Sequence, residues 1–383
     1  MGLGQELEGY LVVAVEQAVA APYCGLLLAD SGARVIKVER PGGDLARAYD
    51  RAANGHSAYF AWLNRGKQSI VLDIDDEQDR ALLLQILSTA DVLLHNLAPG
   101  SLDKRGFTGP ALRQVNRGLV TCEITGYGRK GPYAQMKAYD LLVQAESGLS
   151  AVTGTPQEPA RVGFSVCDIA TGLTAYSAIL RALLARAKSG EGTDISIAMF
   201  DVMADWMNVP LIYQRYRGRA TPRAGLTHPI IAPYGVYRAG DGGEVLISIQ
   251  SNREWTAFCE TVLEAPELAN DARFADNEDR VANRADMDAI INAVFSRHAR
   301  KQLIMLLNER RIACANLNSV ADLERHPQLR NQNVEIDGAE LFLADLPVRA
   351  GKDRPSHVPA LDEHGAAIRR EFAPAGPFKE QDG

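Results

Sequence analysis

The chain has 383 residues, 46% hydrophobic and 23% charged, which is ordinary for a globular protein and long enough for two domains. Its formal net charge of -7 argues against general nucleic-acid binding. Its five cysteines are scattered, with no close pair at metal-ligand spacing, which predicts reduced thiols and no disulfide framework. No stretch reaches the length of a membrane span, and the N-terminus MGLGQELEGY carries no targeting signal, so we expect a cytoplasmic protein.

The first half of the chain alternates between strand and helix patterns. Strands are predicted at 11–15, 34–39, 69–74, 91–96 and 119–124, and helices at 22–30 and 76–90. Strands that are apolar on both faces and separated by helices are typical of a parallel sheet covered on both sides. Such sheets bind their ligands at the carboxyl ends of the strands, and we expect a site there.

Glu39 ends the second predicted strand, where a dinucleotide-binding fold places its ribose contact. That fold also needs glycines between its first strand and first helix, because the backbone approaches a pyrophosphate there. The chain reads EQAVAAPYCG at this point, which excludes that class. Arg40, followed by PGGD, suits an anionic ligand better, since a guanidinium binds phosphate bidentately. A surface ion pair is an equal alternative for Arg40.

The longest apolar periodicity predicts one buried amphipathic helix at 169–187, with its first turn beginning at Asp168. By position this acid is most simply a cap of free backbone N–H groups, and the helix dipole favours its ionised form. A carboxylate kept charged within reach of a substrate could instead act as a nucleophile. The residues alone leave both interpretations open. The adjacent Cys167 should point elsewhere, and we expect a small buried thiol.

The pattern changes after a strand at 194–199 and a helix at 200–213. Residues 215–225 contain four arginines with glycine and proline, which predicts an exposed linker; in a second interpretation one arginine pairs with a substrate carboxylate. The elements predicted beyond it are strands at 234–238, 244–250 and 341–348 and helices at 253–263, 284–298, 301–310 and 363–372. We expect a large domain at 1–214, a linker at 215–226, a small domain at 227–318, and a linker with a C-terminal return to the large domain at 319–383.

Nine blocks of sequence occur in an order and spacing that resemble one family. They are APYCGLLLADSGARVIKVERPGGD, LNRGKQSIVLDI, ADVLLHN with PGSLDKRGF, ITGYGRKGPY, YDLLVQAESGL, CDIATGL, TDISIAMFD, NSVADLERHPQLR and PALDEH. The chain is similar in these blocks to the family III CoA-transferases of the CaiB/BaiF type, which include formyl-CoA transferase and carnitine CoA-transferase. The resemblance implies an α/β fold, with a Rossmann-like large domain built on a parallel sheet, a smaller α+β domain and an interlocked, ring-like homodimer.

The resemblance also implies site residues. The family's catalytic aspartate falls on Asp168, which favours the nucleophile over the cap. The positions that match CoA-binding residues of the family are Gln17, Val19, Ala20, Arg40, Leu72, Asn96, Leu97, Lys104, Lys137, Tyr139 and Met199. Asp75 and Thr125 stand where the family has lysines, and only AGLTHP at 224–229 lies near the place of the family's glycine-rich loop. No metal or redox cofactor is implied, because the CoA thioester is itself a substrate.

The implied reaction moves CoA from an acyl-CoA donor to a carboxylic acid acceptor, through anhydride and aspartyl-CoA thioester intermediates on Asp168. Both tetrahedral species develop an oxyanion, for which we expect the backbone N–H groups at the start of the 169–187 helix. The short chain is similar to members that act on small dicarboxylates such as itaconate, mesaconate or succinate, by transfer between or within molecules. We expect no nucleic-acid or membrane partner.

Two other activities remain open. Racemases of the same superfamily pair the matching aspartate with a histidine, because a proton must leave one face and arrive at the other. Tyr139 stands in that histidine's place, and a phenol is a poor base near neutral pH. His95 and His228 are the histidines we expect nearest the site, in packing or surface roles. A non-catalytic CoA-binding homologue is the other alternative, against which the combination of Asp168 with the CoA-binding positions argues.

Overall fold

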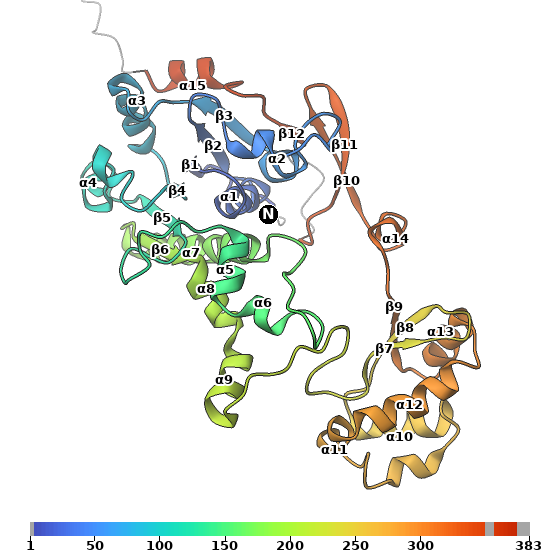
Figure 1. The fold of residues 1–383 in the computed structure, drawn as a ribbon. Helices are drawn as coiled ribbons and strands as arrows, with labels where there is room; N and C mark the ends of the chain where they lie inside the picture. The colour runs from blue at the N-terminus through green and yellow to red at the C-terminus, as the bar shows by residue number, and fades with distance from the viewer. Residues whose placement is uncertain (1–3, 349–355, 374–383) are drawn as a thin grey trace, which may run out of the picture. The chain divides into compact units, whose positions relative to one another are not determined.

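The computed structural model describes residues 4–348 and 356–373, and Figure 1 shows its ribbon. Within these ranges the chain divides into two compact units. The large unit takes its residues from 1–147, 162–207 and 330–383, and the small unit from 148–161 and 208–329. Residues 148–161 and 208–214, which we placed in the large domain from the sequence, thus cluster with the small unit. The chain leaves the large unit and returns to it twice.

A six-stranded parallel sheet forms the centre of the large unit, as its strand patterns predict. The strands are β1 (Leu11–Val15), β2 (Arg34–Glu39), β3 (Lys67–Val71), β4 (Val92–His95), β5 (Val120–Thr125) and β6 (Asp194–Ala198). They are parallel throughout, in the order β3-β2-β1-β4-β5-β6. The strand order reverses between β1 and β4, which is where open α/β sheets bind their ligands.

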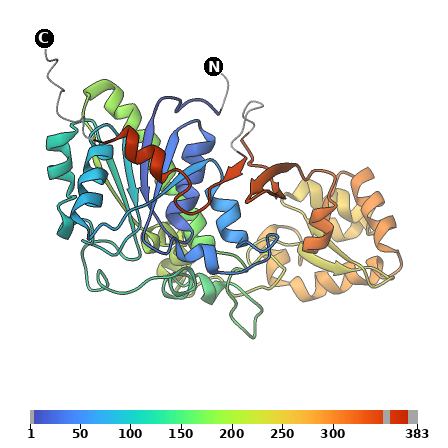
Figure 2. The same ribbon diagram turned by 90° about the horizontal axis from the view of Figure 1, so that it is seen from above.

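Helices cover both faces of this sheet (Figure 2). The helices of the large unit are α1 (Ala20–Asp30), α2 (Ala58–Asn64), α3 (Glu77–Leu87), α4 (Gly109–Val115), α5 (Asp140–Glu146), α7 (Val166–Ser189), α8 (Met199–Trp206) and α15 (Gly365–Glu371), with 3-10 turns η1 (Leu45–Ala48) and η2 (Asp103–Arg105). On one face, Leu83 of α3, Leu112 of α4 and Ile368 of α15 join the apolar side chains of β1 and β2. On the other face α1 packs against β1 and against α7.

The longest helix, α7, begins at Val166, two residues before the start that we expected from the sequence. The Asp140 carboxylate accepts the N–H groups of Cys167 and Asp168 and caps the helix from a different segment of the chain. Gly190 ends the helix in a left-handed conformation with φ of 73°. Asp168 is therefore the third residue of the helix, inside its first turn.

The same helix corrects our expectation about membrane spans. Among residues 4–348 and 356–373, α7 is the one helix long and apolar enough to cross a membrane by length and composition. Its buried side chains, which include Ala170, Ala175, Ile179 and Leu183, recur at three- and four-residue spacing. These side chains belong to the face that packs in the large unit, as in a core helix of a globular protein.

Gly172 lets α7 approach α1 closely. A Cβ atom built at Gly172 would lie 2.5 Å from the Ala20 carbonyl oxygen and 3.1 Å from the Tyr23 Cβ. We therefore expect Gly172→Ala to lower the free energy of unfolding by about 1–3 kcal/mol, since the two helices must move apart. Gly163→Ala, whose new Cβ meets nothing within 4 Å, is the matched control. Equal denaturant midpoints for both variants would contradict this packing.

The C-terminal segment also packs on the large unit. The strands β10 (Asn331–Ile336), β11 (Ala339–Ala344) and β12 (His357–Val358) form a small sheet in the order β11-β10-β12. Val334, Ile336 and Val358 pack there against Phe60 of α2. The parts of the predicted C-terminal return at 349–355 and 374–383, and the first three residues, lie outside the described residues.

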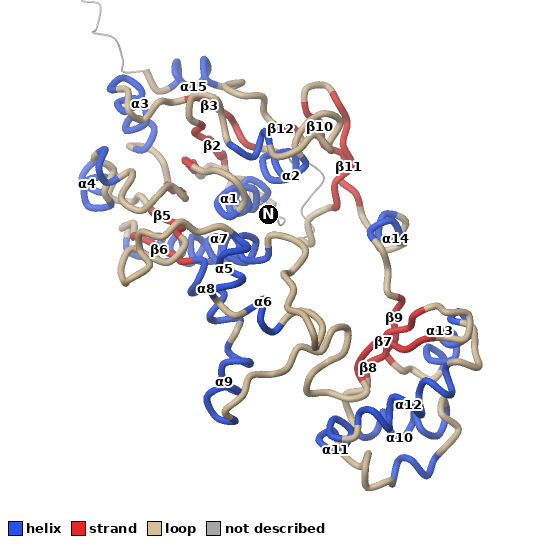
Figure 3. Tube along the Cα trace, viewed as in Figure 1, coloured by secondary structure: helices blue, strands red, loops and turns tan. Residues whose placement is uncertain are grey.

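The small unit contains the hairpin that the sequence predicts. Its helices and strands are α6 (Leu149–Val152), α9 (Asn208–Arg217), β7 (Tyr234–Arg238), β8 (Glu244–Ser248), α10 (Asn252–Thr261), η3 (Pro266–Asn270), α11 (Asn277–Ala282), α12 (Arg284–Phe295), α13 (Arg300–Glu309), β9 (Ala313–Asn316) and α14 (Val320–Glu324). Figure 3 distinguishes its antiparallel sheet, of order β7-β8-β9, from the surrounding helices. The aromatic side chains of Trp255, Phe258, Phe274 and Phe295 form much of its core. The helix expected at 200–213 is two helices, α8 and α9, which meet at Met207.

Candidate functional site

The residues that the family resemblance assigns to CoA follow the carboxyl ends of all six strands of the parallel sheet. Gln17, Val19 and Ala20 follow β1, and Arg40 and Leu72 follow β2 and β3; Asn96, Leu97 and Lys104 follow β4, Lys137 and Tyr139 follow β5, and Met199 follows β6. Parallel strands end at the same edge of a sheet, so the positions that directly follow the strands are brought together along one edge. This is the edge at which we expected a ligand.

Asn96 and Gln17 join the loops that follow the two central strands. The Asn96 side chain accepts the Gln17 N–H at 2.9 Å and donates to the Gln17 carbonyl oxygen at 2.8 Å. This pair lies where the strand order reverses, between β1 and β4. Asn96 therefore fixes the backbone of the turn after β1, and its amide is already occupied.

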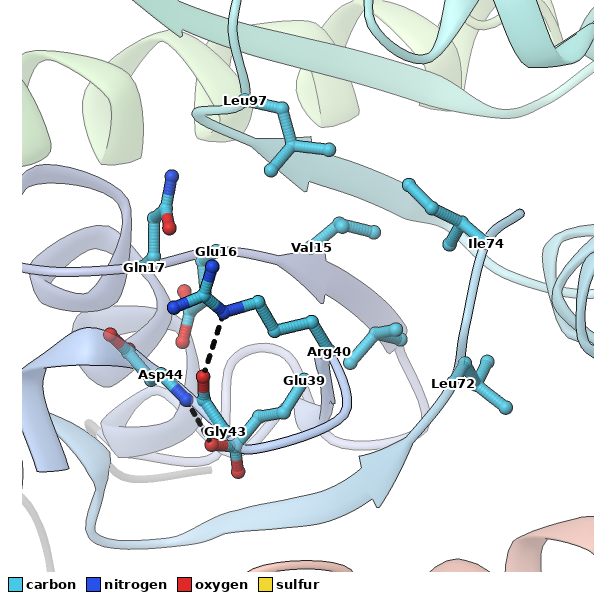
Figure 4. Close-up of a pocket in the computed structure, with 11 residues that line it drawn as sticks. Val15, Glu16, Gln17, Glu39, Arg40, Gly43, Asp44, Leu72, Ile74 and Leu97 are labelled. Carbon is cyan, nitrogen blue, oxygen red and sulfur yellow. Dashed lines mark hydrogen bonds between the residues drawn. The ribbon is translucent and has the colours of Figure 1, made fainter. Parts of the chain in front are cut away.

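A pocket opens beside this turn (Figure 4). Four of the sequence-predicted residues line it, namely Gln17, Arg40, Leu72 and Leu97. Leu72 and Leu97, with Val15, Val38 and Ile74, supply its apolar wall. The Arg40 side chain is exposed, and its Nε donates to the Gly43 carbonyl oxygen at 3.2 Å. Its terminal nitrogens make no hydrogen bond to the described residues and are available to an anion.

Glu39 does not serve as a ribose contact. Its buried carboxylate accepts hydrogen bonds from Arg47, Ser69 and the Asp44 N–H. Burial acts to raise the pKa of Glu39, but Arg47 and Lys37 outweigh burial and hold that pKa at about 2. This carboxylate is a structural anchor for the loop after β2, which agrees with the exclusion of a dinucleotide fold.

Asp168 lies at the N-terminus of α7, next to the start of α1. The next residue, Ile169, packs with Val19 and Leu26, and Gly172 approaches Ala20 one turn further along. Among the described residues nothing donates a hydrogen bond to the Asp168 carboxylate. Burial, followed by the negative charge of Asp140, raises the pKa of Asp168 to about 7. The helix dipole favours the ionised form of this carboxyl, but burial and then the charge of Asp140 act in the opposite sense.

The first turn of α7 has no free backbone donor. Cys167 and Asp168 donate their N–H groups to Asp140 at 2.8 and 3.3 Å, Val166 donates to the Phe164 carbonyl, and Ile169 donates to the Ser165 carbonyl. The expectation that these N–H groups stabilise an oxyanion is therefore wrong for this arrangement. Sequence reasoning missed Asp140, whose only local signal was its place in the YDLL block.

Cys167 is not a rival nucleophile. Its thiol is fully buried, and burial with the negative charges of Asp140 and Asp168 raises its pKa to about 12. A thiol with this pKa remains protonated at neutral pH. The interpretation as a small packing residue is supported.

The structure does not bring every predicted residue into the pocket. Lys104, in the 3-10 turn η2, and Lys137, in the segment between β5 and α5, are exposed, and Met199 is buried at the start of α8. Tyr139 is 68% exposed and precedes α5. Sequence reasoning missed Tyr49, whose pKa is raised by burial and then by the charges of Asp44 and Asp168.

His95, His228 and the linker residue Arg223 take structural positions. His95 is buried at the end of β4, and burial lowers its pKa to about 4. His228 stacks on Tyr234 with ring centroids 5.2 Å apart. Arg223, one of the linker arginines, donates to the carbonyl oxygens of Ala151, Thr155 and Pro156, so this arginine closes a loop of the small unit. Among residues 4–348 and 356–373, no group of three His, Cys, Asp or Glu side chains could hold a metal.

The raised pKa of Asp168 predicts a pH dependence. In the role that the family resemblance implies, Asp168 attacks as the ionised carboxylate, so the single-turnover rate should rise about tenfold per pH unit below 7 and level off above it. Asp140→Asn keeps an oxygen that can accept the two α7 N–H groups but removes the charge, and should move the midpoint to lower pH. Rapid-quench measurements between pH 5 and 9 would give both midpoints. A midpoint unchanged in the variant would contradict the coupling.

Fold and site together define an α/β protein with a pocket at the carboxyl edge of a parallel sheet. A family model described as CoA-transferase family III matches residues 7–364. The acetyl-CoA:oxalate CoA-transferase of Acetobacter aceti is 37% identical over 96% of this chain and 95% of its own, and the succinate–glutarate CoA-transferase of Agrobacterium fabrum is 33% identical over 96% and 95%. The crystal structure of a CAIB/BAIF family protein from Brucella suis, 36% identical, superimposes with a TM-score of 0.82 over 97% of this chain and 100% of that chain.

The chain therefore belongs to CoA-transferase family III and is a CoA-transferase. The family resemblance drawn from the nine sequence blocks is confirmed. An acyl-CoA donor and an acid acceptor are the substrates that this class of enzyme requires.

Proposed function

We propose that the enzyme transfers CoA from an acyl-CoA to a small dicarboxylic acid, with Asp168 as the nucleophile. The observation that carries this proposal is the Asp168 carboxyl group itself. It lies at the ligand-binding edge of the sheet, it accepts no hydrogen bond from the described residues, and burial raises its pKa to about 7. A carboxylate that is poorly solvated and unpaired is a stronger nucleophile than one held in an ion pair.

The reaction proceeds by exchange of acyl bonds. The Asp168 carboxylate attacks the thioester carbonyl, the C–S bond breaks, and a mixed anhydride and CoA thiolate form. The thiolate then attacks the aspartyl carbonyl, which releases the donor acid and leaves an aspartyl-CoA thioester. The acceptor carboxylate reverses these two steps and regenerates Asp168. The bonds that form and break in these steps balance without a proton, a metal ion or an electron from another source.

The chain's own residues bind and orient the reactants. Arg40 is placed to hold a phosphate of CoA, and Gln17, Leu72 and Leu97 line the pocket beside it. We assign Val19, Ala20, Asn96, Lys104, Lys137, Tyr139 and Met199 to the same binding surface on the basis of family resemblance and of their place along the edge. Because the α7 N–H groups are occupied, the oxyanion must be stabilised by donors other than the first turn of α7.

The acceptor is a dicarboxylate. Both relatives reported above are named for such acids, oxalate in one and succinate with glutarate in the other. Mesaconate, itaconate and transfer within one molecule are also compatible with this chemistry. A guanidinium from 215–219 could hold the second carboxylate, whereas Arg223 is committed to backbone carbonyls.

A substrate panel tests the assignment. The enzyme should convert succinyl-CoA or acetyl-CoA and a labelled dicarboxylate into the labelled acyl-CoA, with at least about tenfold higher kcat/KM for dicarboxylates than for monocarboxylates of equal length. The same mixtures in deuterium oxide test the racemase alternative. Deuterium incorporation at the carbon next to the thioester, without transfer of CoA to the labelled acid, would identify an isomerase instead of a transferase. If neither deuterium incorporation nor CoA transfer occurs, only the CoA-binding alternative remains.

We also propose that the enzyme is a cytoplasmic homodimer, interlocked as in the family. The helix α9 has no buried residue in the single chain, and Val209, Ile212 and Tyr216 form an exposed apolar stripe at helical spacing. A second copy of the chain would cover such a stripe. Sedimentation at micromolar concentration should give a dimer, and a fully active monomer would contradict this assembly.

A further inference from the structure

The turn between β1 and α1 contains a strained residue. Ala18 has φ of 64°, in the left-handed region that alanine rarely occupies, and it stands between Gln17 and Val19. Strained backbone persists only where its surroundings hold it, and it concentrates at functional sites. The Asn96 side chain holds the Gln17 peptide groups but makes no contact with the Ala18 N–H. Another group must therefore hold Ala18.

Asp44 is that group. One of its carboxylate oxygens, Oδ1, accepts the Ala18 N–H at 3.0 Å and the Ala46 N–H at 2.9 Å. Its other oxygen, Oδ2, accepts Lys37 Nζ at 2.8 Å. Asp44 is 5% exposed, belongs to the PGGD segment that follows Arg40, and lines the pocket with Gln17 and Arg40.

Lys37 extends the link to the strand before the turn. The Lys37 side chain is fully buried. Its ammonium group lies 3.3 Å from the Glu16 carboxylate and 3.4 Å from the Glu16 carbonyl oxygen. Glu16 immediately precedes Gln17. The contacts from Asp44 through Lys37 to Glu16 thus connect the strained residue Ala18 with the residue that precedes the turn.

We propose that Asp44 is a positioning residue for acyl-CoA binding, which holds the Ala18 turn and the Arg40 loop in one arrangement so that Gln17 and Arg40 face the same pocket. The inference rests on the proposed function in so far as acyl-CoA occupies this pocket. Preorganised loops improve affinity because the ligand does not have to order them. Loss of Asp44 should therefore weaken CoA binding while it changes the chemical step at Asp168 little.

A carboxylate is required at this position because all three neighbours are donors. Asparagine has one acceptor oxygen and one NH₂ group, so either Lys37 or the pair of backbone N–H groups must face a donor. Asp44→Asn should release the Ala18 turn without a change in side-chain volume. Glycine adopts positive φ readily, so Ala18→Gly in the same background should restore the turn.

The experiment measures the Kd of CoA by calorimetry and the KM and kcat for acyl-CoA. Asp44→Asn should raise Kd and KM by about tenfold with kcat within about threefold, and the double variant with Ala18→Gly should recover most of the loss. Asp276→Asn, a helix-capping carboxylate of the small unit, is the matched control and should leave Kd unchanged. Ala18→Val keeps every charge and opposes the left-handed turn, so it should also raise Kd even if Asp44→Asn does not fold.

The outcomes separate the two claims. A wild-type enzyme that transfers CoA, together with Asp44 and Ala18 variants that bind CoA with unchanged Kd, would overturn the positioning role and leave the proposed function intact. A folded double variant no better than Asp44→Asn would likewise overturn it, because a purely stabilising role is not rescued by a glycine in the turn. A wild-type enzyme that binds no CoA would overturn the proposed function itself.

Discussion

Replacement of Asp168 by alanine or asparagine is expected to lower kcat for CoA transfer by about three orders of magnitude or more. In the proposed mechanism every covalent intermediate is formed on this carboxylate, and the thiol of the neighbouring Cys167 is buried with a pKa of about 12. CoA binding should persist, because the pocket beside Arg40 does not include Asp168. Steady-state rates and calorimetric binding of CoA to each variant check the two halves of this prediction.

The asparagine variant should also be more stable than the wild type. The pKa of Asp168 is raised from 3.8 to about 7 in the fold, so the folded state binds the proton more tightly than the unfolded state. Ionisation of Asp168 therefore destabilises the folded state. The destabilisation is absent below about pH 4, grows as the pH rises to 7, and is complete above pH 7. We expect a gain of about 1–2 kcal/mol at pH 8, allowing for solvent screening, and none at pH 4. A variant that is less stable at pH 8 would contradict this environment for Asp168.

Glu16→Gln should cause the largest loss of stability. One Glu16 oxygen accepts both Lys67 Nζ at 2.5 Å and Lys37 Nζ at 3.3 Å, and all three side chains are fully buried. Removal of one charge from a buried ion network leaves its partner uncompensated, which costs about 3–5 kcal/mol. Denaturant unfolding followed by tryptophan fluorescence and circular dichroism measures this cost.

A surface pair provides the control. Arg105 and Asp75 form an ion pair at 2.7 Å in which Asp75 is mostly exposed, so Asp75→Asn should leave unfolding essentially unchanged. A free energy of unfolding for the Glu16→Gln protein within about 1 kcal/mol of the wild-type value would contradict the prediction that Lys37 and Lys67 depend on the Glu16 charge.

Much of the large unit could be predicted because its strands are short and apolar on both faces. The segment 34–39, RVIKVE, is a strand with the predicted bounds, and 11–15 is another. The role of the lysine within RVIKVE could not be predicted from the sequence and follows only from the structure. Lys37 is fully buried, and only the fold brings Glu16 and Asp44 to its ammonium group.

Strands without an apolar pattern were harder to predict. The strand β9, ACAN, is largely exposed and has no alternation of burial, so its side chains carry almost no pattern. The strand β10 was missed for a similar reason, since its first residues are polar and exposed. Such strands form because a neighbouring strand offers backbone partners, and that information is not local.

The site shows the same division. The position of Asp168 on the first turn of a long helix could be predicted from periodicity, and its role from family resemblance. The cap supplied by Asp140, twenty-eight residues earlier, could not, because a cap from a distant segment leaves no local pattern. That cap has two effects: it occupies the N–H groups of Cys167 and Asp168, and its charge adds to burial in raising the pKa of Asp168.

One measurement tests the central claim most directly. The enzyme is incubated with succinyl-CoA, quenched with hydroxylamine and digested, and the peptide that contains Asp168 is analysed by mass spectrometry. An activated aspartyl thioester or anhydride is trapped as a hydroxamate, so we predict that modification on Asp168 and on no other carboxylate, and none in the Asp168→Asn variant. Full CoA transfer with Asp168 unmodified would contradict the account.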